Sequence, residues 1–238
     1  MPHRPEALPG AREARRRQRR DAILAAASRS FLEHGYAATS MSAIAATLGG
    51  SKGTLWRYFP SKQALFAAVM EQRTAAYRAH LSSLLVPSGA LRATLHGFCA
   101  GLIAKITSAD AVGLYRLVVA EAGRFPEMGR SFYEHGPMAT HALLSDFLAG
   151  AMVRGLIHRG DPRVAARLLV TLCTAGCHQR VLTGMIPAAT PAMIEADAEL
   201  AVAVFLDAFA AEGPAAARAK ADPALAHEAA RASRHGGG

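Results

Sequence analysis

The 238-residue sequence contains few cysteines and few charged residues, and it lacks a long apolar run. Each of these shortages excludes some classes of protein. Its three cysteines, Cys99, Cys173 and Cys177, are few and odd in number, which does not suit the disulfide framework of a small secreted protein. The Arg-rich N-terminus lacks the apolar segment of a signal peptide. No apolar run reaches the roughly 18 residues of a membrane span, because Arg167 and Asp207 interrupt the longest candidates. We therefore expect a protein of the reducing cytoplasm without membrane contact.

Sequence motifs for catalysis and metal binding are also missing. We find no phosphate-binding GxxxxGK[ST] loop, no HExxH zinc motif and no dinucleotide-binding glycine pattern. Cys173 and Cys177 share a helix face, but His178 lies about 100° away on a helix and no fourth ligand accompanies them. We therefore expect no enzyme, no cofactor and no metal. A thiol-based redox sensor stays open as a second interpretation of these cysteines.

Positive charge is concentrated at the N-terminal end. Residues 1–80 hold 13 Lys and Arg against 5 Asp and Glu, a net charge of +8, whereas residues 81–212 have a net charge of −1. Such a basic block suits a partner rich in phosphate, although an Arg-rich tail that only aids solubility gives the same count. A solvated helix and a contact with DNA backbone or minor groove are likewise both open for the arginine run Arg15, Arg16, Arg17, Arg19 and Arg20.

Beyond the first 15 residues, nearly every segment is expected to be helical. Alanine is abundant, and no β-branched cluster alternates with a period of two. In the first helix, 16–34, Ile23, Ala27 and Phe31 are four residues apart and give one buried stripe. Glycines and capping residues then separate shorter helices. The expected signals are a stop at Gly35, an N-cap at Thr39-Ser40, a break at Gly49-Gly50, a cap near Ser51, an end at Pro60 and a cap at Ser61.

Longer amphipathic helices are expected in the rest of the chain, near 89–106, 109–123, 126–153, 162–185 and 191–211. The predicted fold class is therefore all-α, with an N-terminal three-helix unit and a larger C-terminal helical domain. The expected boundaries are a flexible basic arm at 1–15, the three-helix unit at 16–62, the helical domain at 63–212 and a disordered tail at 213–238.

Two short helices joined by a glycine-containing turn, inside a basic three-helix unit, predict a helix-turn-helix DNA-binding domain. Leu55 and Phe59, four residues apart, anchor the second short helix and leave its polar side chains for the major groove. Gly53 lets the backbone approach DNA closely. The helix N-terminus at Ser51 attracts a phosphate through its free N–H groups and its dipole.

The segment from Thr39 to Phe66 (TSMSAIAATLGGSKGTLWRYFPSKQALF) resembles the helix-turn-helix of the TetR family of bacterial regulators. The resemblance extends over about residues 16–70. It implies that Ser40 and Ser42 contact the DNA backbone, and that the start of the second short helix lies closest to the bases. The residues expected to contact DNA are Arg19, Ser40, Ser42, Ser51, Lys52, Gly53, Thr54, Trp56, Arg57, Tyr58 and Lys62.

Individual side chains in this set keep a structural alternative. Trp56 fits a DNA contact or the core, Tyr58 fits both a core ring and a polar contact, and Lys62 fits a phosphate contact or plain solvation. Two residues depart from the family pattern. Gly50 stands where Val is usual, so the turn loses an apolar anchor, and Trp56 stands where Tyr is commoner. These departures leave the expected fold unchanged but weaken any inference about the operator sequence.

The segment from Tyr115 to Pro137 (YRLVVAEAGRFPEMGRSFYEHGP) resembles the AefR-like branch of TetR C-terminal domains. This resemblance implies that the C-terminal domain dimerises and binds a small effector. The helices 162–185 and 191–211 are the expected dimer surface, because two helices from each chain can pack as a four-helix bundle. A dimer would present two recognition helices to successive major grooves, about 34–36 Å apart.

An effector pocket is expected among the helices of 89–153 and the inner face of 162–185. Glu121 lies in a mostly apolar helix and fits either an effector cation or a salt bridge between helices, with Arg116 or Arg124 as partner. Each aromatic candidate also fits plain core. The other candidate lining residues are Phe98, Leu102, Tyr115, Val119, Phe132, Met138, His141, Cys177 and His178.

Together these features predict a homodimeric regulator that binds double-stranded operator DNA, with an unidentified small molecule as effector. A repressor that the effector releases from DNA is the first hypothesis. An activator and a ligand-independent repressor remain alternatives. A non-specific architectural DNA-binding protein is a further alternative, but it would not need a separate near-neutral domain of about 130 residues.

Overall fold

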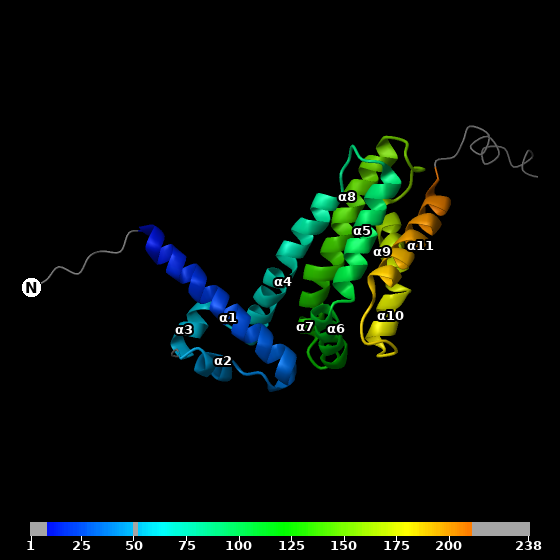
Figure 1. The fold of residues 1–238 in the computed structure, drawn as a ribbon. Helices are drawn as coiled ribbons and strands as arrows, with labels where there is room; N and C mark the ends of the chain where they lie inside the picture. Colours follow the sequence, from blue (N-terminus) through cyan, green and yellow to red (C-terminus); the bar gives the residue numbers. More distant parts are fainter. Residues whose placement is uncertain (1–8, 50–51, 211–238) are drawn as a thin grey trace, which may run out of the picture.

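The computed structural model describes residues 9–49 and 52–210, and within these ranges the fold is helical throughout (Figure 1). One isolated antiparallel bridge pairs Ile157 with Ala210. The all-α prediction is therefore confirmed. The helices are α1 (Pro9–Ala38), α2 (Met41–Thr47), α3 (Lys52–Tyr58), α4 (Lys62–Leu84), α5 (Leu91–Ile106), α6 (Ala109–Glu121), α7 (Pro126–Tyr133), a π-helical turn (Glu134–Met138), α8 (Ala139–Val153), α9 (Pro162–Thr174), α10 (Cys177–Leu182) and α11 (Pro191–Phe209).

The short helices of the N-terminal domain begin and end where the sequence predicts. The hydroxyl of Ser40 accepts from the backbone N–H of Ala43 at 3.1 Å, and Ser61 caps α4 in the same way. Gly35 has a φ of +84° and interrupts α1, while Gly49 has a φ of +59° after α2. Both angles lie in the left-handed region that only glycine adopts without strain. The turn signals were therefore sufficient to place α2 and the start of α4.

The first helix begins earlier than expected. It begins at Pro9, so residues 9–15 are helical rather than part of a flexible arm. Proline is favoured in the first turn of a helix, and the Ala, Glu and Arg residues that follow are strong helix formers. The rest of the predicted arm, residues 1–8, and the predicted tail, residues 213–238, lie outside the described residues.

Two long predicted helices are interrupted. The expected helix 162–185 is divided into α9 and α10, because the Asp197 carboxylate accepts from the backbone N–H of Cys177 at 2.6 Å and lies where a Cβ on Gly176 would be. The expected helix 126–153 contains a π-helical turn around Pro137, which has no N–H for a regular helical bond. Both interruptions lie beside the pocket described below.

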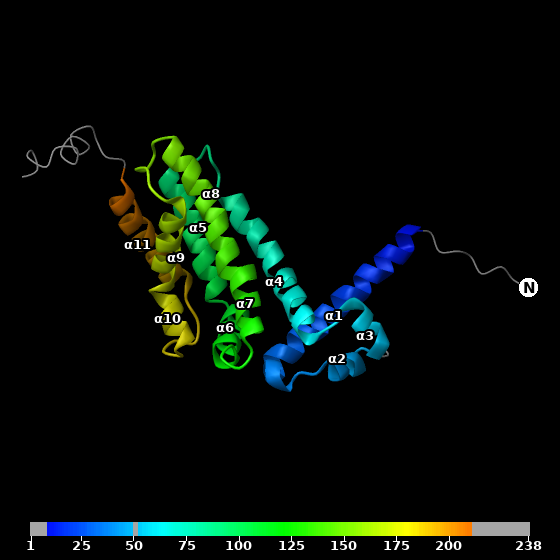
Figure 2. The ribbon, with the colours of Figure 1, turned by 180° about the vertical axis from the view of Figure 1, so that it is seen from behind.

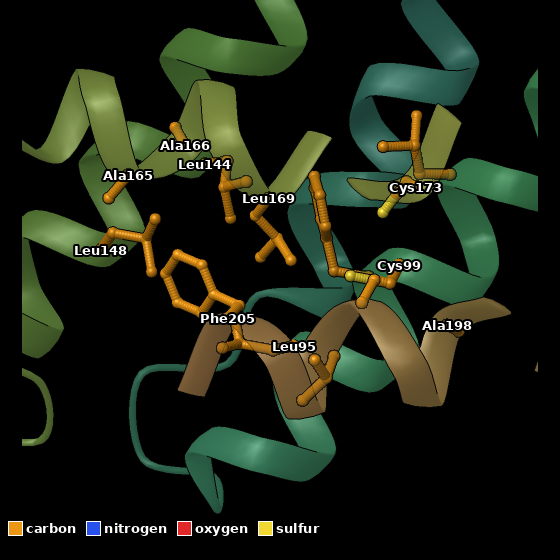
Figure 3. Close-up of a cluster of buried hydrophobic side chains, with 14 of the residues drawn as sticks. Leu95, Cys99, Leu144, Leu148, Ala165, Ala166, Leu169, Cys173, Ala198 and Phe205 are labelled. Atoms are coloured by element: carbon orange, nitrogen blue, oxygen red, sulfur yellow. The ribbon is translucent and has the colours of Figure 1, made fainter. Parts of the chain in front are cut away.

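Two buried cores organise the molecule. The first lies under α1–α3 and includes Phe31 and Leu65, but α6 and α7 also contribute to it through Val118 and Met128. The second fills the C-terminal bundle, where Phe205 of α11 points toward Leu148 of α8 (Figure 3). Two views turned by 180° show α4 running from the N-terminal helices into the bundle (Figures 1 and 2).

Because α4 contributes to both cores, the predicted boundary between residues 62 and 63 stays a prediction. Leu65 near its start belongs to the first core, and Leu81 near its end belongs to the second. Among the residues that the structure describes, none of the helices is long and apolar enough to cross a membrane.

Candidate nucleic-acid interface and effector pocket

The second helix of the helix-turn-helix, α3, is anchored by its apolar side chains and presents its polar ones. Leu55 and Phe59 are buried, as the four-residue spacing predicted. Gly53 and Arg57 are exposed, and Trp56 leaves 40% of its surface in solvent. This exposure disfavours the alternative in which Trp56 belongs to the core. The exposed side of α3 therefore joins an aromatic ring and a guanidinium group, both of which suit contacts with DNA.

The remaining predicted DNA contacts have different surroundings. Tyr58 and Thr54 are half-buried on α3, and Lys52 is its first residue. Ser42 is half-buried on α2. Ser40 is exposed and already caps α2. Ser51 lies outside the described residues, and Arg19 donates from Nη2 to the carbonyl of Leu48 at 3.4 Å, at the end of α2.

Lys62 has a structural role in the N-terminal domain. Its Nζ donates to the carbonyl oxygens of Tyr36 at 2.8 Å and Thr39 at 3.1 Å, and it lies 4.4 Å from the centre of the Tyr36 ring. Burial lowers the pKa of Lys62, which Glu121 and Glu127 partly oppose. Two of its three donors thus bind the end of α1 and the link that follows it. The geometry favours this tether over the predicted phosphate contact.

Glu121, expected in the effector pocket, instead joins the two domains. Its two carboxylate oxygens accept from the consecutive backbone N–H groups of Tyr36 and Ala37, each at 2.7 Å. A Cβ at Gly35 would lie 2.7 Å from the same carboxylate. The left-handed φ of Gly35 therefore turns the end of α1 so that both N–H groups face the last residue of α6.

Aromatic packing surrounds this junction. The Tyr36 ring is buried and stacks on Phe31, with Phe66 and Phe125 against it edge-on. Burial, together with Glu127 beside the hydroxyl, raises the pKa of Tyr36 to about 12. The junction is thus a packed aromatic cluster with a carboxylate at its edge, and α6 is fixed to the N-terminal domain at its C-terminal end.

A cavity of about 310 Å³ lies where α4, α5, α6, α8 and α9 meet. Its surface is mostly apolar. The hydroxyl of Tyr77 is buried there, and none of the described residues forms a hydrogen bond with it. The lining residues are Arg73, Thr74, Tyr77, Arg78, Leu102, Lys105, Ile106, Ala111, Leu114, Tyr115, Phe132, His135, Gly136, Pro137, Thr140, His141, Val170, Thr171, Thr174 and His178.

The cavity brings together half of the residues predicted to line an effector pocket: Leu102, Tyr115, Phe132, His141 and His178. The other predicted residues lie elsewhere. Phe98 is fully buried in the bundle core, Cys177 lines a separate shallow depression beside Asp197, and Val119 and Met138 are exposed away from the cavity.

Sequence reasoning missed the contribution of α4 to this cavity. Thr74, Tyr77 and Arg78 come from α4, which precedes the segments 89–153 and 162–185 that we expected to form the pocket. Tyr77 lies among alanines and polar residues in the sequence, so its spacing does not separate a cavity wall from ordinary packing. The π-helical turn, which brings Gly136 and Pro137 to the cavity, had no sequence signal except Pro137 itself.

The charges around the cavity are unequal. Within the described part of the chain, no Asp or Glu lines it, whereas Arg73, Arg78 and Lys105 do. Arg73 and Arg78 pair with carboxylates outside the cavity, and Lys105 lies 5.9 Å from the centre of the Tyr77 ring. Burial lowers the pKa of His141, with Arg167 adding to the shift, and burial lowers the pKa of His178, which favours the neutral form of both imidazoles. The cavity wall is therefore neutral to positive.

The cysteines are buried thiols. Cys99, Cys173 and Cys177 are all free and buried. A hydrogen bond to Cys173 and burial raise the pKa of Cys99, and burial together with Asp197 raises the pKa of Cys177 to about 11. In residues 9–49 and 52–210 no group of three His, Cys, Asp or Glu side chains is placed to hold a metal. These surroundings favour packing over thiolate chemistry.

The turn of the helix-turn-helix also contains a sequence pattern that is typical of some hydrolases. Residues 49–53 spell G-x-S-x-G, the pattern of a hydrolase nucleophile turn. That turn follows a β-strand, whereas here helix α2 precedes it. The pattern therefore carries no catalytic prediction.

A basic three-helix unit with an exposed second helix, joined to a helical domain with an apolar cavity, defines a two-domain DNA-binding regulator. The family model described as "Bacterial regulatory proteins, tetR family" matches residues 23–69, and the one described as "AefR-like transcriptional repressor, C-terminal domain" matches residues 93–211. The chain belongs to the TetR family of bacterial transcriptional regulators, as its resemblance in sequence predicted.

Individual relatives agree with this assignment. A TetR-family regulator from Mesorhizobium loti MAFF303099 is 28% identical, with a TM-score of 0.72 over 81% of this chain and 96% of that one. The "Flavonoid-responsive Regulator FrrA" is 34% identical, with a TM-score of 0.69 over 80% of this chain and 96% of that one. The repressor ComR from Escherichia coli K12 is 32% identical over 92 residues, which span 38% of this chain and less than half, 44%, of ComR.

Proposed function

We propose that this regulator is a homodimeric repressor that binds a near-palindromic operator and is released by a small effector in the cavity between α4 and α9. The observation that carries the proposal is the position of α6. Its middle, at Leu114 and Tyr115, lines the cavity, and its end, at Glu121, binds the N-terminal domain. One helix thus belongs to the candidate sensor and to the support of the candidate DNA reader.

Exposed apolar side chains on α9 and α11 support a dimer. Val164 and Leu168 are four residues apart on α9, and Leu200 and Val204 are four residues apart on α11. Each pair forms one stripe of a helix surface. The two helices pack against each other, so these stripes suit a twofold four-helix bundle with a second copy. A dimer then aligns two α3 helices with one operator.

The effector that fits this cavity is an aromatic molecule, uncharged or anionic. The aromatic walls at Tyr115 and Phe132 meet nearly edge-to-face, with ring centres 5.9 Å apart, and suit a further ring. Among the described residues, no carboxylate lines the cavity to offset the desolvation of a cation, whereas Lys105 favours an anion. FrrA, whose structure aligns with 80% of this chain, is described as flavonoid-responsive, and flavonoids have this chemistry.

Effector release follows as a population shift. A ligand that binds more tightly to one arrangement of α6 shifts the population toward it, and the DNA affinity changes by the same coupling free energy. Because α6 ends at the Tyr36 and Ala37 amides, a displacement of α6 alters the position of the N-terminal domain. In a dimer, this changes the separation of the two α3 helices.

The proposal is tested by selecting duplexes from a random library and measuring binding by fluorescence anisotropy. We expect a near-palindromic site that the dimer binds at least about 1000-fold more tightly than random DNA, with release by the flavonoid naringenin but not by the lipophilic cation tetraphenylphosphonium. Equal binding to every duplex would overturn the operator. Release by the cation alone would overturn the effector class but leave the operator intact.

A double substitution tests the dimer independently. L168E/L200E places four carboxylates in the proposed interface of a dimer, and we expect a monomer by light scattering at micromolar concentration. The matched control, V119E/M138E, changes two exposed apolar residues outside α9 and α11 and should stay dimeric. A monomeric parent protein, or a dimeric L168E/L200E variant, would show that the interface lies elsewhere.

A further inference from the structure

The N-terminal half of α1 carries a stripe of arginines on one face. Arg12, Arg15, Arg16 and Arg19 follow the spacing i, i+3, i+4 and i+7, which places them on one side of a helix. The same side continues into the buried stripe that begins at Ile23. These arginines therefore lie on the side of α1 that, further along the helix, packs against the N-terminal domain. The part of α1 that carries them extends beyond the other helices of that domain (Figures 1 and 2).

The recognition helix forms the other wall of this surface. Arg12, Arg15 and Arg16 of α1 line a common hollow with Arg57 and Tyr58 of α3. Four guanidinium groups and one phenol hydroxyl, all of them hydrogen-bond donors, thus converge from two helices. Arg57, which lines the hollow, directly follows the exposed Trp56 on α3.

The positive charge of the hollow is uncompensated within the described part of the chain. Arg12, Arg15, Arg16 and Arg57 are exposed, and none of them makes an ion pair there. By contrast, the nearby Arg19 and Arg20 have partners in the protein, the Leu48 carbonyl and the Phe59 ring. A row of like charges that face one another is unfavourable without an anion, and planar guanidinium groups suit the paired oxygens of a phosphate.

The geometry points to a phosphate clamp: Arg12, Arg15 and Arg16, with Arg57 and Tyr58, hold the DNA backbone that flanks the bases read by α3. The clamp positions the protein on the duplex and reads no bases itself. It extends the footprint of each half-site beyond the helix-turn-helix. It also gives the helical residues 9–15, which were expected to be a flexible arm, a fixed direction toward the DNA.

The clamp predicts a measurable salt dependence. Each phosphate that the protein neutralises contributes about 0.9 to the slope of log affinity against log salt concentration. Removing one such phosphate interaction from each protomer of a dimer reduces the slope by about 2 and weakens binding about 10- to 100-fold at roughly 0.1 M salt. Because phosphates carry no sequence information, the ratio of affinities for operator and scrambled DNA should stay unchanged.

The test measures anisotropy of the R15A/R16A variant on a selected 30-base-pair duplex and on a scrambled one, at four salt concentrations. Alanine is a stronger helix former than arginine, so α1 should stay folded, which circular dichroism verifies. R15K/R16K keeps the charge and should retain the slope while losing part of the affinity, because lysine lacks the planar fork. The scrambled duplex tests the clamp even where no operator is recovered.

Two controls separate the clamp from general electrostatics. R159A/R163A removes the same charge from the exposed start of α9, far from α3 (Figure 1), and should leave the slope unchanged. R17A removes one charge from the opposite side of α1 and should change the DNA affinity less than threefold. R16A removes one charge from the clamp side and should weaken DNA binding more than R17A does. Equal effects of R16A and R17A would overturn the clamp, and so would a changed base preference in R15A/R16A.

Discussion

Replacing Glu121 with Gln tests the junction between the two domains. The substitution keeps the length of the side chain but removes its charge and one of its two acceptors. The amide oxygen can still accept from the backbone N–H of Tyr36 or Ala37, and the amide NH₂ then faces the other N–H without bonding to it. The perturbation is therefore local, and it acts on the contact that joins the end of α6 to the end of α1.

The expected cost follows from these two bonds. A hydrogen bond to a charged group contributes about 1.5–3 kcal/mol, but Ala37 is exposed and its N–H regains a bond with water. We therefore expect E121Q to lose about 1–2 kcal/mol of the free energy of unfolding, and E121A about 2–4 kcal/mol. For a chain of this size, the E121Q loss corresponds to a melting temperature lower by roughly 2–8 °C.

The assays are thermal unfolding at fixed protein concentration, hydrogen exchange of the Tyr36 and Ala37 amides, and the change in DNA affinity caused by effector. We expect faster exchange at both amides and a smaller effector response. The control is E134Q, since Glu134 is exposed and makes no hydrogen bond or ion pair among the described residues. If E121Q matched the parent in all three measurements, the junction would not stabilise or couple the domains.

Other parts of the structure give predictions of the same kind. G35A should lose about 2–4 kcal/mol of stability by denaturant titration, because it adds a side chain at a φ of +84° and its Cβ meets the Glu121 carboxylate; an unchanged midpoint would contradict the geometry. Y77F should fold with equal or higher stability but bind naringenin about tenfold more weakly by calorimetry, since no described residue bonds to the buried hydroxyl and the proposed effector would satisfy it; unchanged affinity would place the ligand elsewhere. Cys177, with a pKa raised to about 11, should resist iodoacetamide at pH 8 in the folded protein and react once urea unfolds it; rapid labelling of the folded protein would revive the redox sensor. Folding lowers the pKa of His178, so as the pH drops below 6.5 the unfolded chain binds the proton first and the free energy of unfolding decreases. H178Q should flatten this dependence in urea titrations at several pH values, and an equal slope would refute it.

The N-terminal domain was predictable because its signals are local. Capping serines such as Ser40 and glycines such as Gly49 act within a few residues, and the spacing of Leu55 and Phe59 fixes which side of α3 is buried. The strong helix formers in residues 9–15 also indicated the early start of α1, but the arginines and prolines of residues 1–15 were interpreted as a flexible arm. Local chemistry therefore determines the elements here, and the errors lie at their ends.

The candidate effector cavity was harder to predict because it depends on which helices meet. Leu102 and Phe132 line it, whereas Phe98, one turn before Leu102 on the same helix, is fully buried in the core. The sequence reveals that α5 has an apolar side but not which part of it meets a gap between helices. The break at Gly176 was equally hidden, because the carboxylate that causes it belongs to Asp197, about 20 residues away.

The position of Glu121 shows why the two functions of such a protein need not be assigned to separate domains. A carboxylate inside an apolar helix looked like a ligand for an effector cation or a salt bridge to another helix. The structure instead satisfies it with two backbone amides of the other domain. Because the core beneath α1–α3 also contains Val118 of α6 and Met128 of α7, the DNA-binding unit is completed by helices of the C-terminal domain. A ligand in the cavity would contact the middle of that same α6, at Leu114 and Tyr115. Closely packed interiors do not deform smoothly, so we expect a displacement of α6 to be taken up at the junction, and in the proposed function this is how a small molecule would change the orientation of α3.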